Sequence, residues 1–207
     1  DVIDLGCTPG VPFPELGAVV RELRAAGLRV SIDSFDPAEI RNAVAAGAEL
    51  ILSINGSNRE VIPDLRGSGV RVVAIPDFGA GLDTLDPTLE ALTAAGIPFL
   101  IDPILEPIGF GFMTSLERYA TIQRRYPGVP QMMGIGNLTE LTSADTTGVN
   151  ALLIAIAQGM ADEGLPRQGQ GFLGLLRAAG SGAVGGQAGE DVEQPAGRGP
   201  HGEVEGV

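Results

Sequence analysis

Small polar side chains follow the apolar segments of this chain, one after nearly every segment. Each segment is rich in Val, Ile and Leu and ends at an Asp or an Asn; these residues are Asp4, Asp33, Asn55, Asp77, Asp102 and Asn137. An ionised Asp accepts two hydrogen bonds in one plane, and an Asn both donates and accepts. Together they can bind the edge of a flat, neutral heterocycle that carries several N–H donors. We therefore expect a ligand site where these side chains meet, with Asp33, Asn55 and Asp102 on neighbouring strand ends.

The same residue types also have local structural uses, because Asp and Asn are frequent helix N-caps and turn formers after strands. Asp36 is such a cap, and Asp4 and Asp77 are open to the same interpretation. A capping role is less expected for Asp33, because Asp36 already caps the helix that follows it. Asp102 precedes a long loop that has no helix to cap. The two readings stay open at each single position.

Other kinds of chemistry have less support in the sequence. A carboxylate-rich rim suits Mg²⁺ or Ca²⁺, but no calcium-loop spacing is present, and the one histidine, His201, lies far from the apolar segments. We therefore predict no protein-only metal site. Cys7 follows the first segment without a histidine nearby to activate it, which favours a small packing or rim residue over a nucleophile. The glycine pairs at 109–111 and 134–136 lack the lysine of a phosphate-binding loop.

Apolar segments alternate with helical patterns along most of the chain. Strands are expected at about 1–6, 28–33, 49–54, 70–76, 97–102 and 129–135, and helices at about 14–26, 36–46, 57–67, 86–95, 114–126 and 147–158. Continuous apolar strands that alternate with helices predict an all-parallel α/β sheet. The even repeat length and the polar residue at nearly every strand end favour a TIM-type (β/α)8 barrel over a doubly wound sheet. Only about six βα units are recognisable, so the barrel is expected to be incomplete.

Helix boundaries carry their own signals. Capping boxes, in which an N-cap side chain and a Glu three residues later exchange hydrogen bonds with the backbone, are expected at 36–39, 57–60 and 114–117. Gly27, Gly47 and Gly96 are expected to end helices in the left-handed conformation.

The chain divides into a partial barrel at 1–158 and a Gly-rich tail at 159–207. The tail is expected to be disordered or non-native in sequence, because it has few apolar residues to offset the entropy of ordering. Within it, 172–180 is at best one loosely packed helix. The chain also opens inside a strand-like run without an initiator Met, so we expect a fragment of a longer protein.

Charge and composition limit the partners. The chain has 26 acidic residues and 13 basic ones, all of them arginine, which gives a net charge of −13. Such a charge repels nucleic acid phosphates and anionic lipids, so neither nucleic acid nor a membrane is expected as a partner. A single cysteine and the lack of a leader or long apolar run favour the cytoplasm.

Five motifs together resemble the pterin-binding barrel superfamily, which comprises the dihydropteroate synthases and the methyltetrahydrofolate:corrinoid methyltransferases. The motifs are DLG, VSIDS, LILSINGSN, LIDPILEPIGFGF and MMGIGNLTEL, and the resemblance covers about residues 1–157. It is greatest to the dihydropteroate synthase-related proteins of organisms that use tetrahydromethanopterin. The resemblance implies that Asp33, Asn55 and Asp102 hold a pterin ring and that Asn137 lies near the reacting atoms as the catalytic residue.

The chain also departs from the synthases. Their Ser-Arg-Lys loop is replaced by Asn137-Leu-Thr-Glu140, Phe112 stands where they have a basic residue, and no lysine occurs anywhere. Arg59 is the one cation expected near the rim, together with Asp4 and Asp77 as further rim residues. A departing diphosphate is poorly stabilised by such a site.

What the resemblance implies is a dihydropteroate synthase-like transferase of folate or tetrahydromethanopterin one-carbon metabolism, with a pterin as substrate or cofactor. Mg²⁺ is implied where the substrate is a diphosphate. Two alternatives stay open: a methyltransferase that acts on a corrinoid protein, and a non-catalytic pterin-binding scaffold. The open edges of an incomplete barrel also lead us to expect either poor solubility or pairing with another copy in a homodimer.

Overall fold

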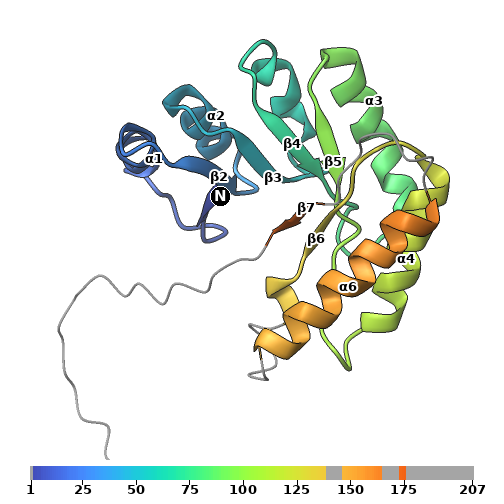
Figure 1. Cartoon of the computed structure of the whole chain (residues 1–207). Coiled ribbons are helices and arrows are strands. Elements are labelled where there is room, and N and C mark those ends of the chain that lie inside the picture. The colour runs from blue at the N-terminus through green and yellow to red at the C-terminus, as the bar shows by residue number, and fades with distance from the viewer. Residues whose placement is uncertain (1, 139–145, 165–172, 176–207) are drawn as a thin grey trace, which may run out of the picture.

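The computed structural model describes residues 2–138, 146–164 and 173–175 (Figure 1). The strands are β1 (Val2–Gly6), β2 (Arg29–Asp33), β3 (Leu50–Ile54), β4 (Arg71–Ala74), β5 (Phe99–Ile101), β6 (Met132–Gly134) and β7 (Leu173–Leu175). The helices are α1 (Leu16–Ala25), α2 (Pro37–Ala46), η1 (Arg59–Leu65), η2 (Leu82–Leu85), α3 (Asp86–Ala95), α4 (Phe112–Arg125) and α6 (Thr146–Gly164). Most of the expected 159–207 tail lies outside these residues.

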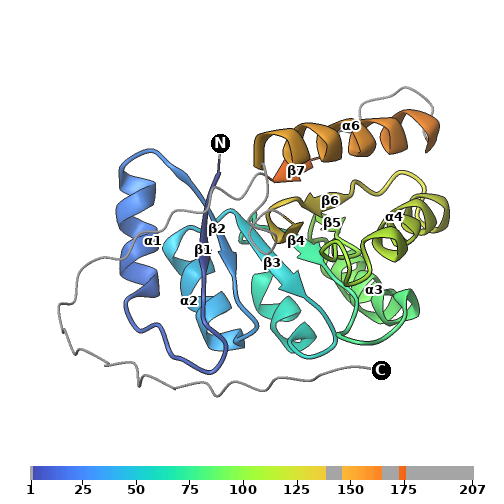
Figure 2. The ribbon, with the colours of Figure 1, turned by 90° about the horizontal axis from the view of Figure 1, so that it is seen from below.

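The strands follow one another in space in the order in which they occur in the chain. β1 to β5 form a parallel sheet in the order β1-β2-β3-β4-β5, and β6 and β7 form a parallel pair. A parallel bridge between Ile101 and Gln131 joins the two groups, and the Ile101 N–H donates to the Pro130 carbonyl at 3.1 Å. Sequential order is the topology of a TIM barrel, whereas a doubly wound sheet reverses its order at a switch point. The predicted barrel-type α/β fold is confirmed, and within the described residues the sheet stays open (Figure 2).

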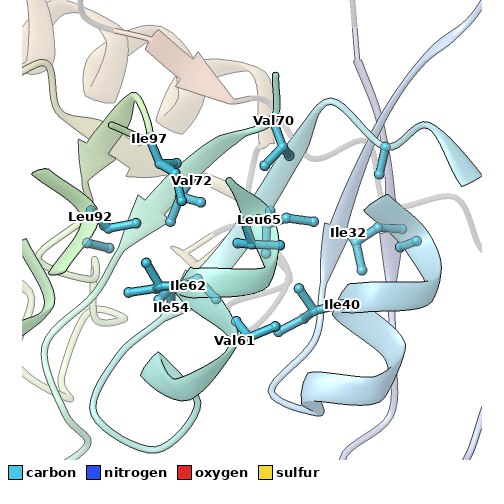
Figure 3. Close-up of a cluster of buried hydrophobic side chains, with 14 of the residues drawn as sticks. Ile32, Ile40, Ile54, Val61, Ile62, Leu65, Val70, Val72, Leu92 and Ile97 are labelled. Atoms are coloured by element: carbon cyan, nitrogen blue, oxygen red, sulfur yellow. The ribbon is translucent and has the colours of Figure 1, made fainter. Parts of the chain in front are cut away.

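Both faces of the inner strands β2, β3 and β4 are largely buried, as the continuous apolar strands predict, whereas the edge strand β1 is partly exposed. The main core lies between the strands and α1, α2, η1 and α3, where side chains such as Ile32, Ile54 and Val72 meet Ile40 and Leu92 (Figure 3). On the opposite face, alternate positions of the same strands form a second cluster; its members are Leu50, Leu52, Val73, Ile75, Leu100 and Met132. A third cluster lies under α4 and α6.

Of the capping box predicted at 36–39, the N-cap is confirmed and the return bond from Glu39 is wrong. The Asp36 side chain accepts from the N–H of Ala38 at 2.7 Å, so it is the N-cap of α2. Glu39 does not bond back to Asp36. Its carboxylate instead accepts from the Phe13 N–H at 3.1 Å and the Ser34 hydroxyl at 2.6 Å. Glu39 therefore ties the loop after β1 to the loop after β2.

The capping box at 57–60 is wrong. The expected helix at 57–67 is the 3₁₀-helix η1, whose N-cap Asn58 makes no side-chain capping bond. Pro63 lies inside this segment and removes one backbone donor, which disfavours a regular α-helix there.

The capping box at 114–117 is wrong as well. Helix α4 begins at Phe112, after Gly111 in the left-handed region with φ 119°, so Thr114 lies inside the helix. At the carboxyl ends of α2 and α3, by contrast, Gly47 and Gly96 adopt left-handed φ of 104° and 68°, as predicted.

The C-terminal part of the barrel also differs from the expectation. A loose helix was predicted at 172–180, but residues 173–175 form strand β7, which pairs in parallel with β6 from Leu173 opposite Met132. The edge of β6 supplies the backbone partners that a short apolar segment needs, and local sequence does not reveal them. Helix α6 runs on to Gly164, past the expected end at 158. None of the described helices is long and apolar enough to cross a membrane.

Candidate functional site

A cavity of about 210 Å³ opens at the carboxyl ends of the strands. Its polar lining comes from Asp4, Asp33, Ser53, Asp102 and Asn137, and its apolar lining includes Phe35, Leu52, Val73, Ile75, Phe78, Ile104 and Met132. Four of the six polar residues expected at strand ends thus surround one hollow. The strands that carry them are parallel, so their carboxyl ends lie at the same rim.

Asp102 is the most constrained of these residues. It follows β5 directly and is only 5% exposed. Its Oδ1 accepts from the Tyr119 hydroxyl at 2.6 Å and from the Ile104 N–H at 2.8 Å. Tyr119 belongs to α4 and is itself buried. Helix α4 therefore fixes the carboxylate from the side opposite the cavity.

Burial raises the pKa of Asp102 from 3.8 to about 6. Hydrogen bonds from Tyr119 and from the backbone of Ile104 and Gly134, together with the charge of Arg118, act in the opposite direction and favour the ionised form. The same burial, and the negative charge of Asp102, raise the pKa of Tyr119 well above its usual value. Tyr119 thus remains a donor, and Asp102 carries a negative charge above about pH 6.

Asp33 and Asp4 lie on β2 and β1, two strands that pair with each other at the other end of the sheet. Asp33 ends β2, and its Oδ1 accepts from the Ser53 hydroxyl at 2.7 Å. Asp4, in β1, accepts on Oδ1 from the Ser31 hydroxyl at 2.7 Å. In each pair a serine of the adjacent strand orients the carboxylate. The cavity therefore has three carboxylates, each held by a hydroxyl donor.

Asn137 completes the rim after β6. Its Nδ2 lies 3.4 Å from the Leu105 carbonyl oxygen and donates to it, which links the loop after β6 to the loop after β5. A Cβ atom on Gly134 would lie 3.2 Å from the same amide nitrogen. A small residue at 134 therefore allows the carboxamide to approach the backbone.

The structure does not place Asn55 in the lining of this cavity. Asn55 is 2% exposed, and its Oδ1 accepts from both the N–H and the hydroxyl of Ser57, at 2.9 Å and 2.7 Å. Its N–H donates to Asn58 Oδ1 at 2.9 Å. Asn55 thus builds the turn after β3, and its role in pterin binding stays a prediction.

Two further residues expected at the rim lie elsewhere. Asp77 accepts from the Gly56 N–H at 2.7 Å and braces the loop after β4 against the turn after β3. Arg59 lines a separate depression between η1 and α3, together with Arg66 and Glu60. Neither belongs to the cavity lining among the described residues.

An aromatic pair at the mouth of the cavity was not predicted from the sequence. The rings of Phe35 and Phe78 lie 5.3 Å apart at 59°, and Phe78 is 71% exposed. Exposed phenylalanine beside a polar rim is typical of a binding site for a flat ring. Their positions, two residues after Asp33 and one after Asp77, carry a signal that was available in the sequence.

Two residues of the cavity wall have strained backbones. Ser53 and Ile104 have φ of 67° and 68°, and no other non-glycine residue among those described has positive φ. A β-branched residue is rarely found in this region. No sequence signal indicated either.

Among the described residues, the polar groups that line the cavity are mainly hydrogen-bond acceptors, and no thiol is among them. Cys7 lies outside the cavity lining, and burial, with a contribution from Glu39, raises the pKa of its thiol to about 12, so it stays protonated. Within the described ranges no group of three or more His, Cys, Asp and Glu side chains has the arrangement of a metal site. The cavity suits a flat ligand with several N–H donors.

Solved structures of dihydropteroate synthases have the same fold. The synthase of Xanthomonas albilineans with bound indole-2-carboxylic acid and 6-chloroguanine is 29% identical, with a TM-score of 0.57, over 79% of this chain and 71% of that one. The synthase of Thermus thermophilus in complex with 6HMPPP is 21% identical, with a TM-score of 0.58, over 80% of this chain and 74% of that one. The chain thus has a dihydropteroate synthase-like fold.

Comparison of the sequence with known proteins does not identify a family. No protein-family profile matches the chain. An uncharacterised protein of Methanocaldococcus jannaschii is 36% identical over an alignment of 142 residues, and the match covers 61% of this chain. The match spans 27% of that relative's length, so the relative is much longer than the segment it shares with this chain.

Proposed function

We propose that the cavity binds a pterin and that the chain is the pterin-binding part of a dihydropteroate synthase-like transferase of folate or tetrahydromethanopterin metabolism. The observation that carries the proposal is the position of Asp102. It is a buried carboxylate that α4 holds from behind, and it lines a cavity with Asp33 and Asn137 in a fold shared with the synthases.

The pterin ring presents N–H donors along one edge, and Asp102 and Asp33 accept them. The cavity is smaller than the roughly 300 Å³ of a typical drug-sized site, which suits a bicyclic ring without a long substituent. Asn137 also lines the cavity and is proposed to contact the reacting part of the pterin, its exocyclic methylene or N5. Mg²⁺ would enter only with a diphosphate substrate.

Asn55 is proposed to act through its neighbours. It bonds to Asn58, and Asn58 Nδ2 donates to the Ser53 carbonyl at 3.1 Å. Ser53 in turn holds Asp33. The turn that Asn55 builds therefore supports the orientation of the Asp33 carboxylate.

The test is calorimetry with 6-hydroxymethylpterin and the variant Asp102→Ala. Loss of a buried charged acceptor is expected to weaken binding by about 2–4 kcal/mol. Arg59→Ala is the matched control, because Arg59 lines a different depression and is expected to leave affinity unchanged. Equal affinity in Asp102→Ala and the unaltered protein would contradict the proposal.

A methyltransferase that acts on a corrinoid protein is a second candidate, and the place of Asn137 at the cavity favours it. Two assays separate the candidates: methyl transfer from a methylated tetrahydropterin to a corrinoid protein, and condensation of a pterin diphosphate with 4-aminobenzoate in the presence of Mg²⁺. Activity in only one of them identifies the reaction.

A non-catalytic pterin-binding scaffold is a third candidate, favoured by the lack of any lysine in the chain. Pterin binding without turnover in either assay would select it. For all three candidates we propose a cytoplasmic protein that pairs with a second copy, and sedimentation of the purified protein tests the pairing.

A further inference from the structure

Two adjacent residues of α4 bind three consecutive residues of the loop that carries Asp102. Arg118 Nε donates to the Pro103 carbonyl at 2.9 Å, and Arg118 Nη2 donates to the Ile104 carbonyl at 2.6 Å. Tyr119 donates to Asp102 Oδ1. The planar guanidinium is suited to two carbonyls at once, because its donors have a fixed geometry. Two adjacent helix residues thus fix the conformation of loop residues 102–104.

That segment has a conformation that the chain would not adopt alone. Ile104 has φ 68°, and its N–H bends back to Asp102 Oδ1 at 2.8 Å. A strained residue of this kind persists only where surrounding contacts hold it. The contacts of Arg118 with the carbonyls on either side of the Ile104 N–H supply that constraint.

We infer that Tyr119 and Arg118 are positioning residues for ligand recognition, which fix Asp102 Oδ1 so that the other carboxylate oxygen receives a ligand N–H. The inference rests on the proposed pterin site. Tyr119 fixes the carboxylate through its hydroxyl, and Arg118 fixes the backbone that carries it. Neither residue lines the cavity itself.

Charged and titratable groups approach Asp102 from several elements. Asp4 and Asp33 line the same cavity from β1 and β2. Arg118 and Tyr119 lie on α4, and Glu106 Oε1 lies 3.7 Å from Arg118 Nη2. Burial disfavours a charge on Asp102, whereas the Tyr119 hydroxyl and the charge of Arg118 favour it. Without the hydroxyl, Asp102 holds its proton to a higher pH and accepts a ligand N–H less well.

The test is Tyr119→Phe, which removes the hydroxyl and keeps the buried ring. Tyr126→Phe is the matched control: its hydroxyl also donates to a carboxylate, that of Asp86, and neither residue lines the cavity. Two measurements are made on each protein. One is the carboxyl titration of Asp102 by ¹³C NMR without ligand, and the other is calorimetry with 6-hydroxymethylpterin across the pH range.

In Tyr119→Phe we expect the Asp102 titration to move to higher pH and the affinity for the pterin near pH 6.5 to fall on the order of tenfold, with recovery as the pH rises. Tyr126→Phe is expected to change neither. Arg118→Lys keeps the positive charge but cannot donate to both loop carbonyls in the same fixed geometry. We therefore expect weaker pterin binding with little change in the titration of Asp102.

The outcomes are distinct. If both Tyr119→Phe and Arg118→Lys bind the pterin as the unaltered protein does, the inference is overturned. An unchanged Asp102 titration in a folded Tyr119→Phe protein overturns the role of the hydroxyl. If the unaltered protein binds no pterin, the proposed function fails, while the NMR titration still tests whether Tyr119 controls Asp102.

Discussion

Replacing Asp102 by Asn is expected to stabilise the fold while it removes the proposed ligand acceptor. Asp102 is buried apart from 5% of its surface, and its pKa is raised from 3.8 to about 6. A difference of about two pKa units corresponds to roughly 3 kcal/mol between the protonated and ionised forms. Asn has the same shape and carries no charge, and its oxygen still accepts from Tyr119 and from the Ile104 N–H.

The pH dependence of this effect has a definite sign. The folded protein binds the Asp102 proton more tightly than the unfolded chain does, so this residue makes the fold less stable as the pH rises from about 4 to about 6. Above about pH 6 the full cost is present. The stability gain of Asp102→Asn is therefore expected to be near zero at about pH 4 and to reach up to about 3 kcal/mol at about pH 8.

The assay is urea unfolding of both proteins at several pH values between these limits. Asp83→Asn is the matched control, since Asp83 is exposed in η2 and the same change there is expected to stay within about 0.5 kcal/mol at any pH. A destabilised Asp102→Asn, or a gain that does not vary with pH, would refute the argument that ionised Asp102 is costly.

Three further predictions concern the mouth of the cavity and the helix ends. Phe78→Ala is expected to weaken pterin binding by about 1 kcal/mol in calorimetry with little change in stability, because the ring is 71% exposed. Gly47→Ala is expected to lower the free energy of unfolding by about 1 kcal/mol, since φ there is 104°, while Gly159→Ala in α6, with nothing within 4 Å, is expected to raise it slightly. Asp36→Ala is expected to cost about 1 kcal/mol in thermal unfolding, because Asp36 caps α2.

The sequence was sufficient for the order of the first six strands and for part of the site. Polar residues at the ends of parallel strands converge for topological reasons, so Asp4, Asp33, Asp102 and Asn137 were found together without knowledge of any side-chain contact. Asn55 satisfied the same rule but lies outside the cavity lining. The rule places a Cα atom at the rim, and the hydrogen bonds of the following turn decide where the side chain points.

The features that the sequence did not reveal depend on contacts between distant segments. Tyr119 lies 17 residues after Asp102, on a helix whose apolar face predicts only burial. Strand β7 is three residues long and is defined by its pairing with β6. The left-handed Ile104 has no local cause in its residue type. Each of these features follows from tertiary geometry, which periodicity and capping signals do not encode.

Three energetically costly features of this fold lie at the cavity. Asp102 is a buried carboxylate with a raised pKa, and the left-handed residues Ser53 and Ile104 both line the same hollow. None of these costs is needed to form the sheet, because an Asn at 102 and glycines at the other positions would satisfy the backbone at lower free energy. Contacts from α4 and from the turn after β3 hold two of these features in place, Ile104 through Arg118 and Ser53 through Asn58. These costs do not stabilise the barrel. The need to present oriented hydrogen-bond acceptors to a ligand explains them better.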